Sequence, residues 1–103
     1  MASPIRKLTL VCPKELEPTI ADALAVNDLD VSAYTCFDAR GRGNSMELSS
    51  ASEKVQGAMR TVVFMMVLPS AEVDGVLSIV KTACPTPRIS YWLESIEDFG
   101  RLK

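Results

Sequence analysis

Arginines and glycines alternate in the segment Arg40-Gly41-Arg42-Gly43, and this pattern suits a site for an anion. Glycines allow backbone N–H groups to approach an anion closely, and arginines add positive charge and forked hydrogen-bond donors. The segment therefore predicts a site for a phosphate or an acidic partner, with a solvated basic turn as the alternative. It is neither a P-loop nor a complete dinucleotide fingerprint, because Met46 stands where a third glycine would be.

Further basic residues lie near the expected ends of the strands and in the C-terminal tail. We expect them, together with the arginine-glycine segment, to line a cleft between subunits that holds a small anionic ligand. For each base taken alone, a solvated surface charge is the competing interpretation. The four residues are Arg60, Arg88, Arg101 and Lys103.

Catalytic chemistry is not indicated by the residue types present. The sequence contains no histidine, so the commonest general base and the commonest transition-metal ligand are missing. Several serines follow the arginine-glycine segment, and Lys54 is not paired with any of them as a base. Three widely spaced cysteines, Cys12, Cys36 and Cys84, form no CxxC pair and predict reduced thiols that pack as small apolar groups. We therefore expect a non-enzymatic protein without a cofactor.

Length and composition predict one globular domain over residues 1–103. The chain has 48% hydrophobic residues and a formal net charge of -2, which excludes a disordered chain. Acidic residues outnumber basic ones by 13 to 11, so a general nucleic-acid binder is excluded as well. The longest apolar run, Val62 to Leu68, is too short to span a bilayer, and the N-terminus carries no secretory signal. We expect a cytoplasmic protein that does not insert into a membrane.

Hydrophobic periodicity predicts four strands and two helices in the order β-α-β, β-α-β. Pro18 fits the first turn of the first helix, and Ser70 is a natural N-cap for the second. A long loop over residues 40–58 joins the second and third strands. The strands are expected over residues 5–11, 31–38, 60–68 and 88–96, and the helices over residues 14–26 and 70–83.

This order favours an α+β, ferredoxin-like split βαβ fold: a four-stranded antiparallel sheet with both helices on one face. The third strand is apolar on both faces, and its second face carries Val63, Met65 and Val67. A strand that is half-exposed to solvent is expected to have a polar side. We therefore predict that other copies of the chain bury this second face, with the long loop folding back over it as the alternative.

The segments Lys7-Leu8-Thr9-Leu10-Val11, Ala23-Leu24 and Gly41-Arg42-Gly43, in this order, resemble the PII-like family of trimeric signalling proteins. Other segments resemble a small bacterial branch of this family that is often encoded beside heavy-metal efflux pumps. These segments are Leu8-Thr9-Leu10-Val11-Cys12-Pro13, Glu53-Lys54-Val55-Gln56-Gly57, Val67-Leu68-Pro69-Ser70-Ala71, Ser90-Tyr91-Trp92 and Phe99-Gly100-Arg101-Leu102.

The resemblance implies a homotrimer with ligand sites in the clefts between subunits, where PII proteins bind adenine nucleotides such as ADP, ATP or AMP. Residues 40–58 correspond to the T-loop, which docks on a partner protein such as a transporter or an enzyme. Gly41 and Arg42 match the glycine and arginine at the base of that loop, and Arg60 falls where the family has a lysine near the loop's end. Arg88 falls near the lysine of the phosphate-binding B-loop. Arg101 and Lys103 match the basic C-terminal segment.

Two departures from the family pattern bear on the ligand. Pro85-Thr86-Pro87 replaces the glycine-rich B-loop, and prolines lack the N–H groups that would hold phosphate. The efflux-linked branch often carries histidines in its loop, and this chain has none. The alternative function is that of a metal-tolerance accessory protein, which contacts an efflux pump or binds a metal through Cys36, Cys84 or Met46.

Overall fold

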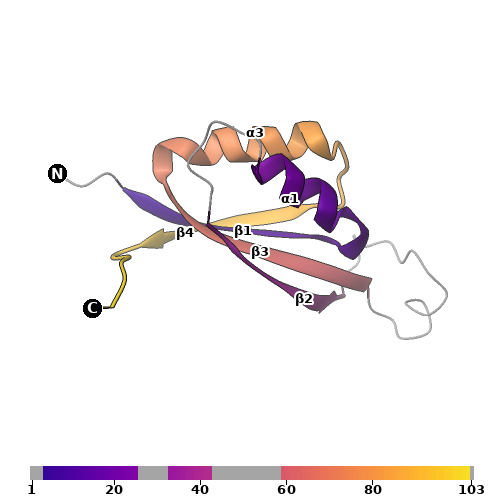
Figure 1. Cartoon of the computed structure of the whole chain (residues 1–103), viewed down its shortest axis with the longest axis horizontal. Helices are drawn as coiled ribbons and strands as arrows, with labels where there is room; N and C mark the ends of the chain where they lie inside the picture. Colours follow the sequence, from indigo (N-terminus) through magenta and orange to yellow (C-terminus); the bar gives the residue numbers. More distant parts are fainter. Residues whose placement is uncertain (1–3, 26–32, 43–58, 103) are drawn as a thin grey trace.

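The computed structural model describes residues 4–25, 33–42 and 59–102, and within them four strands and two α-helices (Figure 1). A short 3₁₀ turn precedes each α-helix. In chain order the elements are β1 (Ile5–Pro13), η1 (Lys14–Leu16), α1 (Glu17–Ala25), β2 (Thr35–Gly41), β3 (Met59–Pro69), η2 (Ser70–Glu72), α3 (Val73–Ala83) and β4 (Ser90–Ile96).

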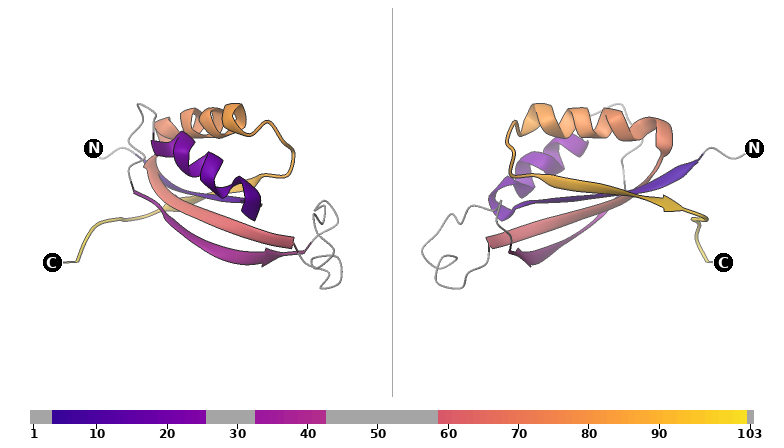
Figure 2. Two further views of the ribbon diagram at one scale, coloured as in Figure 1. Left: turned by 45° about the vertical axis from the view of Figure 1, so that its right-hand side comes forward. Right: turned by 180° about the vertical axis from the view of Figure 1, so that it is seen from behind.

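The four strands form one sheet in the order β2-β3-β1-β4, and every neighbouring pair is antiparallel. Both α-helices lie on one face of this sheet, and no helix of the described residues lies on the other face (Figures 1 and 2). The predicted ferredoxin-like α+β fold is therefore confirmed.

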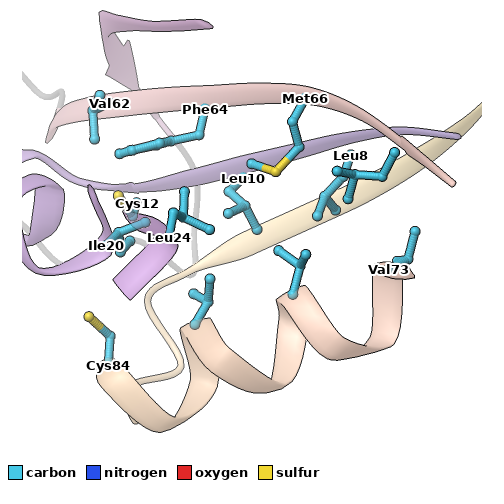
Figure 3. Close-up of a cluster of buried hydrophobic side chains, with 13 residues drawn as sticks. Leu8, Leu10, Cys12, Ile20, Leu24, Val62, Phe64, Met66, Val73 and Cys84 are labelled. Atoms are coloured by element: carbon cyan, nitrogen blue, oxygen red, sulfur yellow. The ribbon is translucent and has the colours of Figure 1, made fainter. Parts of the chain in front are cut away.

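The hydrophobic core lies between the helices and the covered face of the sheet (Figure 3). Phe64 of β3 stands directly opposite Leu10 of β1, and both side chains are buried. Ile20 of α1 and Val76 of α3 close the core from the helical side. Fully burying side chains of this size stabilises the fold by roughly 1.5–3 kcal/mol each.

Some strands begin or end at residues other than the predicted ones, because hydrogen-bonded pairing with a neighbouring strand, and not the local hydrophobic pattern, sets these bounds. β2 was expected over residues 31–38, but it starts at Thr35 and ends at Gly41, because the pairs Thr35–Met65 and Gly41–Met59 delimit its ladder with β3. β1 extends to Pro13 instead of residue 11, since its ladder with β3 continues to that residue. β4 begins at Ser90 instead of residue 88.

The prediction that Ser70 caps the second helix was wrong. Pro69 holds the cap position before η2, no side-chain capping bond forms, and the helix proper begins at Val73. The amide of Ser70 instead donates to the carbonyl of Pro4 at 2.9 Å. The first helix behaves similarly: residues 14–16 form η1, and α1 starts at Glu17.

The uncovered face of the sheet, here named the open face, carries the odd-numbered side chains of β3. Val63, Met65 and Val67 are half-buried on it. Phe37 of β2 stands opposite Val63 and is 47% exposed, and Trp92 of β4 is 48% exposed. The structure thus shows an apolar face that the helices leave uncovered. Its burial by other copies stays a prediction, and the alternative cover, residues 43–58, lies outside the described residues.

Within the described residues, none of the helices has the length and apolar character needed to cross a membrane.

Candidate functional site

The candidate residues are positioned by one end of the sheet, here named the loop end. Strands β1 and β2 finish there at Pro13 and Gly41, and strands β3 and β4 start there at Met59 and Ser90. Residues 42 and 59, which flank the long loop, are therefore at this end (Figure 1). Antiparallel pairing consequently brings together bases that are far apart in sequence.

Arg40 and Arg60 face each other directly across β2 and β3 at the loop end. Like charges in this cross-strand position repel and destabilise the pair. A pocket of about 190 Å³ lies beside them, and Lys14, Asp38 and Thr61 also contribute to its wall. The pocket has three basic side chains against one carboxylate, so its electrostatics favour an anion.

Lys14 is held at the edge of this pocket by two carboxylates. Its ammonium group donates hydrogen bonds to Asp38 of β2 and to Glu17 of α1. The hydrogen bonds to Asp38 and then to Glu17 raise the pKa of Lys14 above its ordinary value. This network ties η1 to the end of β2. The sequence analysis placed Arg40 in the anion-binding segment but did not select Lys14, which only the folded chain brings to this pocket.

Thr61 also lines this pocket, but as an odd-numbered residue of β3 it directs its side chain to the open face. The residue is 2% exposed, and its Oγ1 has no hydrogen-bond partner in the part of the chain that the structure describes. A buried polar group without a partner costs roughly 1–3 kcal/mol.

Arg88 lies in the turn between α3 and β4, at the same end of the sheet. Its Nη1 donates a hydrogen bond to Glu15 Oε1 at 3.0 Å, and this contact joins the turn to η1. Nε and Nη2 of the same guanidinium are buried, and neither has a hydrogen-bond partner among residues 4–25, 33–42 and 59–102. Glu15 and Lys14 are adjacent in η1, so this turn contributes Lys14 to the pocket and Glu15 to the contact with Arg88.

The backbone amides of this turn are already committed. Pro85 and Pro87 carry no N–H group. The amide of Thr86 donates to the carbonyl of Cys84 at 2.8 Å, and the amide of Arg88 donates to Thr86 Oγ1 at 3.2 Å. The backbone of residues 85–88 therefore offers no amide donor to a ligand.

The structure thus brings some of the predicted ligand-binding residues together within one chain. Gly41 is the last residue of β2, Arg42 follows it with an exposed side chain, and both lie at the loop end with Arg60 and Arg88. Arg101 lies at the opposite end of the sheet, beyond the last pair of β4 (Figure 2). Its inclusion in the site would require a second subunit, as predicted. Gly43 and Lys103 lie outside the described residues.

The residues of the metal-binding alternative do not form a cluster in the described part of the chain. Cys84 is buried after α3, and Cys36 is exposed on the edge strand β2. Met46 lies outside the described residues. No group of three or more histidine, cysteine or acidic side chains suited to a metal occurs within the described ranges. Metal binding therefore stays a prediction.

Comparison with known proteins shows the family to which the chain belongs. The sequence model of the family described as "Protein of unknown function (DUF3240)" matches residues 2–103. The chain belongs to this family. No curated protein matches the sequence significantly. The crystal structure of a DUF3240 family protein from Shewanella baltica OS155 is similar over the whole of both chains, with a TM-score of 0.77 and 19% identity.

Two PII structures are similar to this DUF3240 chain. CPII, a nitrogen regulatory PII-like protein from Thiomonas intermedia K12 bound to ADP, AMP and bicarbonate, has a TM-score of 0.69 and 14% identity. That match covers 96% of this chain and 97% of CPII. Arabidopsis thaliana PII bound to citrate has a TM-score of 0.73 and 16% identity, over 97% of this chain and 84% of that one. The fold of the DUF3240 chain is therefore PII-like.

Proposed function

We propose that this protein is a non-enzymatic, PII-like regulatory protein that works as a homotrimer. It binds a small anion, in the first place an adenine nucleotide, in clefts between subunits at the loop end of the sheet. It acts on a partner protein, such as a transporter or an enzyme, through residues 40–58. The observation that carries the proposal is the pocket of Lys14, Arg40 and Arg60 at the point where the long loop leaves β2 and enters β3. Arg88 lies at the same end of the sheet, before β4, and is joined to η1 through Glu15.

The charge pattern of the loop end supports an anionic ligand. Arg40 and Arg60 repel each other across the ladder, and an anion beside them would relieve that repulsion. Arginine is well suited to phosphate and carboxylate groups because its planar fork binds two oxygens at once. Two proteins of the same fold are described with small anions: ADP, AMP and bicarbonate on CPII, and citrate on the Arabidopsis protein.

The open face supports association with further copies. Phe37 and Val63 form one apolar cross-strand row, and Met65 and Trp92 flank Thr9 in the next row. A contiguous apolar surface of this kind is characteristic of protein interfaces and rare on monomers. Association through this face would leave the loop end and the helices accessible to ligands and partners.

The proposal also offers a route from ligand to partner. The walls of the pocket include Arg40 of β2 and Arg60 of β3, so they adjoin both ends of the long loop. An anion between these strands would alter the strand ends from which residues 43–58 extend. Ligand binding thereby changes how residues 40–58 meet the partner, which is a known mode of switching.

The proposal is tested by light scattering followed by calorimetric titration with ATP, ADP and AMP. We expect a trimer that binds at least one nucleotide at micromolar strength, with a loss of tenfold or more in Arg42→Ala and Arg88→Ala. Arg6→Ala is the matched control, because Arg6 lies toward the opposite end of β1 and its Nη1 donates a hydrogen bond to the adjacent carbonyl of Ile5. A trimer that binds none of the three nucleotides would contradict the nucleotide assignment.

A further inference from the structure

Two features decide which anions the turn at residues 85–88 can hold. Nε and Nη2 of Arg88 have no hydrogen-bond partner in the described ranges, and the backbone amides of the turn are already hydrogen-bonded. We infer that Arg88 binds one terminal oxyanion, a phosphomonoester or a carboxylate, side-on through Nε and Nη2, and that the turn does not hold a polyphosphate chain. This inference rests on the proposed function for the place of the site, and it adds the chemical class of the ligand group.

The geometry of the guanidinium points to side-on binding. Nη1 is occupied by Glu15 Oε1 at 3.0 Å, so the end of the fork is anchored to η1. The N–H groups of Nε and Nη2 lie parallel on the other edge of the planar group, and their spacing matches two oxygens of one carboxylate or phosphate. These are the two nitrogens that are buried without a hydrogen-bond partner in the described ranges.

Burial of unpaired charged donors is unfavourable, and an oxyanion would remove that cost. Protein atoms cover both nitrogens, so the side chain must turn outward to meet a ligand. The Arg88 side chain is 26% exposed and its partner Glu15 is 54% exposed, so the ion pair lies at the surface.

The committed amides limit the ligand to one group at this turn. Glycine-rich phosphate loops bind several phosphates through successive backbone N–H groups. Here Pro85 and Pro87 have no N–H, and the amides of Thr86 and Arg88 have acceptors within the turn. A second or third phosphate would therefore gain no hydrogen bond from this backbone. In a glycine-rich turn, each added phosphate would instead gain hydrogen bonds from backbone N–H groups.

The inference is tested by NMR on protein labelled with ¹⁵N-arginine. The Nε–H resonance of Arg88 is assigned by its absence from Arg88→Lys, which keeps the charge but removes the fork. The protein is titrated with orthophosphate, bicarbonate and tripolyphosphate, in an Arg40→Gln background that weakens the neighbouring pocket. The orthophosphate and bicarbonate arms distinguish a phosphate from a carboxylate-like group. The Nε–H resonance of Arg6, at the other end of β1, is the internal control.

We expect a saturable shift of the Arg88 resonance with orthophosphate, with bicarbonate or with both, and no shift for Arg6. Tripolyphosphate should bind no more than about threefold more tightly than the better of the two, and Arg88→Lys should weaken binding about tenfold. An Arg88 resonance that none of the probes moves would overturn the inference. So would tripolyphosphate that binds at Arg88 tenfold or more tightly than both small anions.

These outcomes separate the inference from the proposed function. If orthophosphate moves the Arg88 resonance while ATP, ADP and AMP do not bind, the side-on site stands and the nucleotide assignment fails. If a nucleotide binds to the trimer while the Arg88 resonance stays unchanged, the regulatory proposal stands and the side-on site fails.

Discussion

Two strand-to-helix corners of the molecule share one backbone construction and differ in their side chains. In each corner a strand ends in proline, a three-residue 3₁₀ turn follows, and an α-helix begins. Pro13 has φ -56° and ψ 142°, and Pro69 has φ -56° and ψ 138°. The amides of Glu17 and Val73 close the two turns on the carbonyls three residues earlier. The two βαβ halves are therefore built alike at these points.

The side chains of the two corners lead to different surroundings. In the first corner, Lys14 binds Asp38 and Glu15 binds Arg88, so η1 is tied to β2 and to the turn before β4. In the second corner, the corresponding residues are Ser70 and Ala71, and the backbone amide of Ser70 binds the carbonyl of Pro4. The shared backbone positions the helices on the sheet. The charged pair Lys14 and Glu15 in η1 joins the first corner to the proposed anion site at the loop end.

The largest difference is expected from Arg88→Ala, which removes the fork held by the first corner. Loss of charge-assisted hydrogen bonds should weaken binding of the preferred anion roughly ten- to hundredfold. Ser70→Ala in the second corner should leave the affinity unchanged. Calorimetric titration of both variants measures the difference, and an equal loss in the two would show that the corners do not differ in function.

A second difference is expected at alkaline pH. Cys12 precedes Pro13, whereas Leu68 occupies the same place before Pro69. Burial, with a smaller contribution from Cys84 and then Glu17, raises the pKa of the Cys12 thiol to about 12. The folded state therefore favours the neutral thiol. Its stabilising contribution is complete below pH 9, the ordinary pKa, and is lost as the pH rises from 9 toward 12.

The loss should reach about 1.4 kcal/mol of unfolding free energy per pH unit within that window. Denaturant unfolding of the protein and of Cys12→Val between pH 7 and 10.5 tests this, because valine cannot ionise. The stability of Cys12→Val should fall less steeply above pH 9. Parallel pH curves for the two proteins would refute the assignment of this alkaline loss to Cys12.

Smaller effects of equal size are expected from the two prolines. Pro13→Ala and Pro69→Ala should each lower the unfolding free energy by about 0.4–1 kcal/mol, because alanine leaves the unfolded chain more freedom at a φ angle that proline already adopts. Anion affinity should fall only in Pro13→Ala, since only that corner positions Lys14 and Glu15. Chemical denaturation and titration of the same samples separate the two effects.

The smallest effect is expected from Lys14→Ala. This change removes one positive charge beside Arg40 and Arg60 and releases Asp38. Affinity for an anion should fall about threefold at low salt, and the difference should shrink near 0.5 M salt because screening weakens exposed charges. Titrations at two salt concentrations measure it. A difference that persists undiminished at high salt would point to direct contact instead of long-range charge.

The fold could be predicted from the sequence because its strongest signals are local. The apolar run of β3 and the three-and-four spacing of α3 gave both elements to within three residues at either end. The bounds of β2 could not be predicted in this way. Its side chains are mostly exposed, so only the ladder with β3 sets where it starts and ends.

The site was predictable in part for a related reason. Arg60 and Arg88 could be selected as basic residues at element ends. The contact of Arg88 with Glu15 joins residues 73 positions apart, and no local pattern indicates it. The sequence predicts only that a helix starts at Lys14, and the contacts of its ammonium group with two carboxylates appear only in the folded chain. Residues that act through long-range contacts therefore required the structure.

Hydrogen exchange with and without AMP tests the central claim, that the loop end of the sheet is where a ligand acts. We expect slower exchange in residues 38–42, 59–61 and 84–89, a change in residues 43–58, and no change in the second corner, residues 68–73. Exchange that slows in the second corner, or a bound ligand that leaves the loop end unchanged, would contradict it.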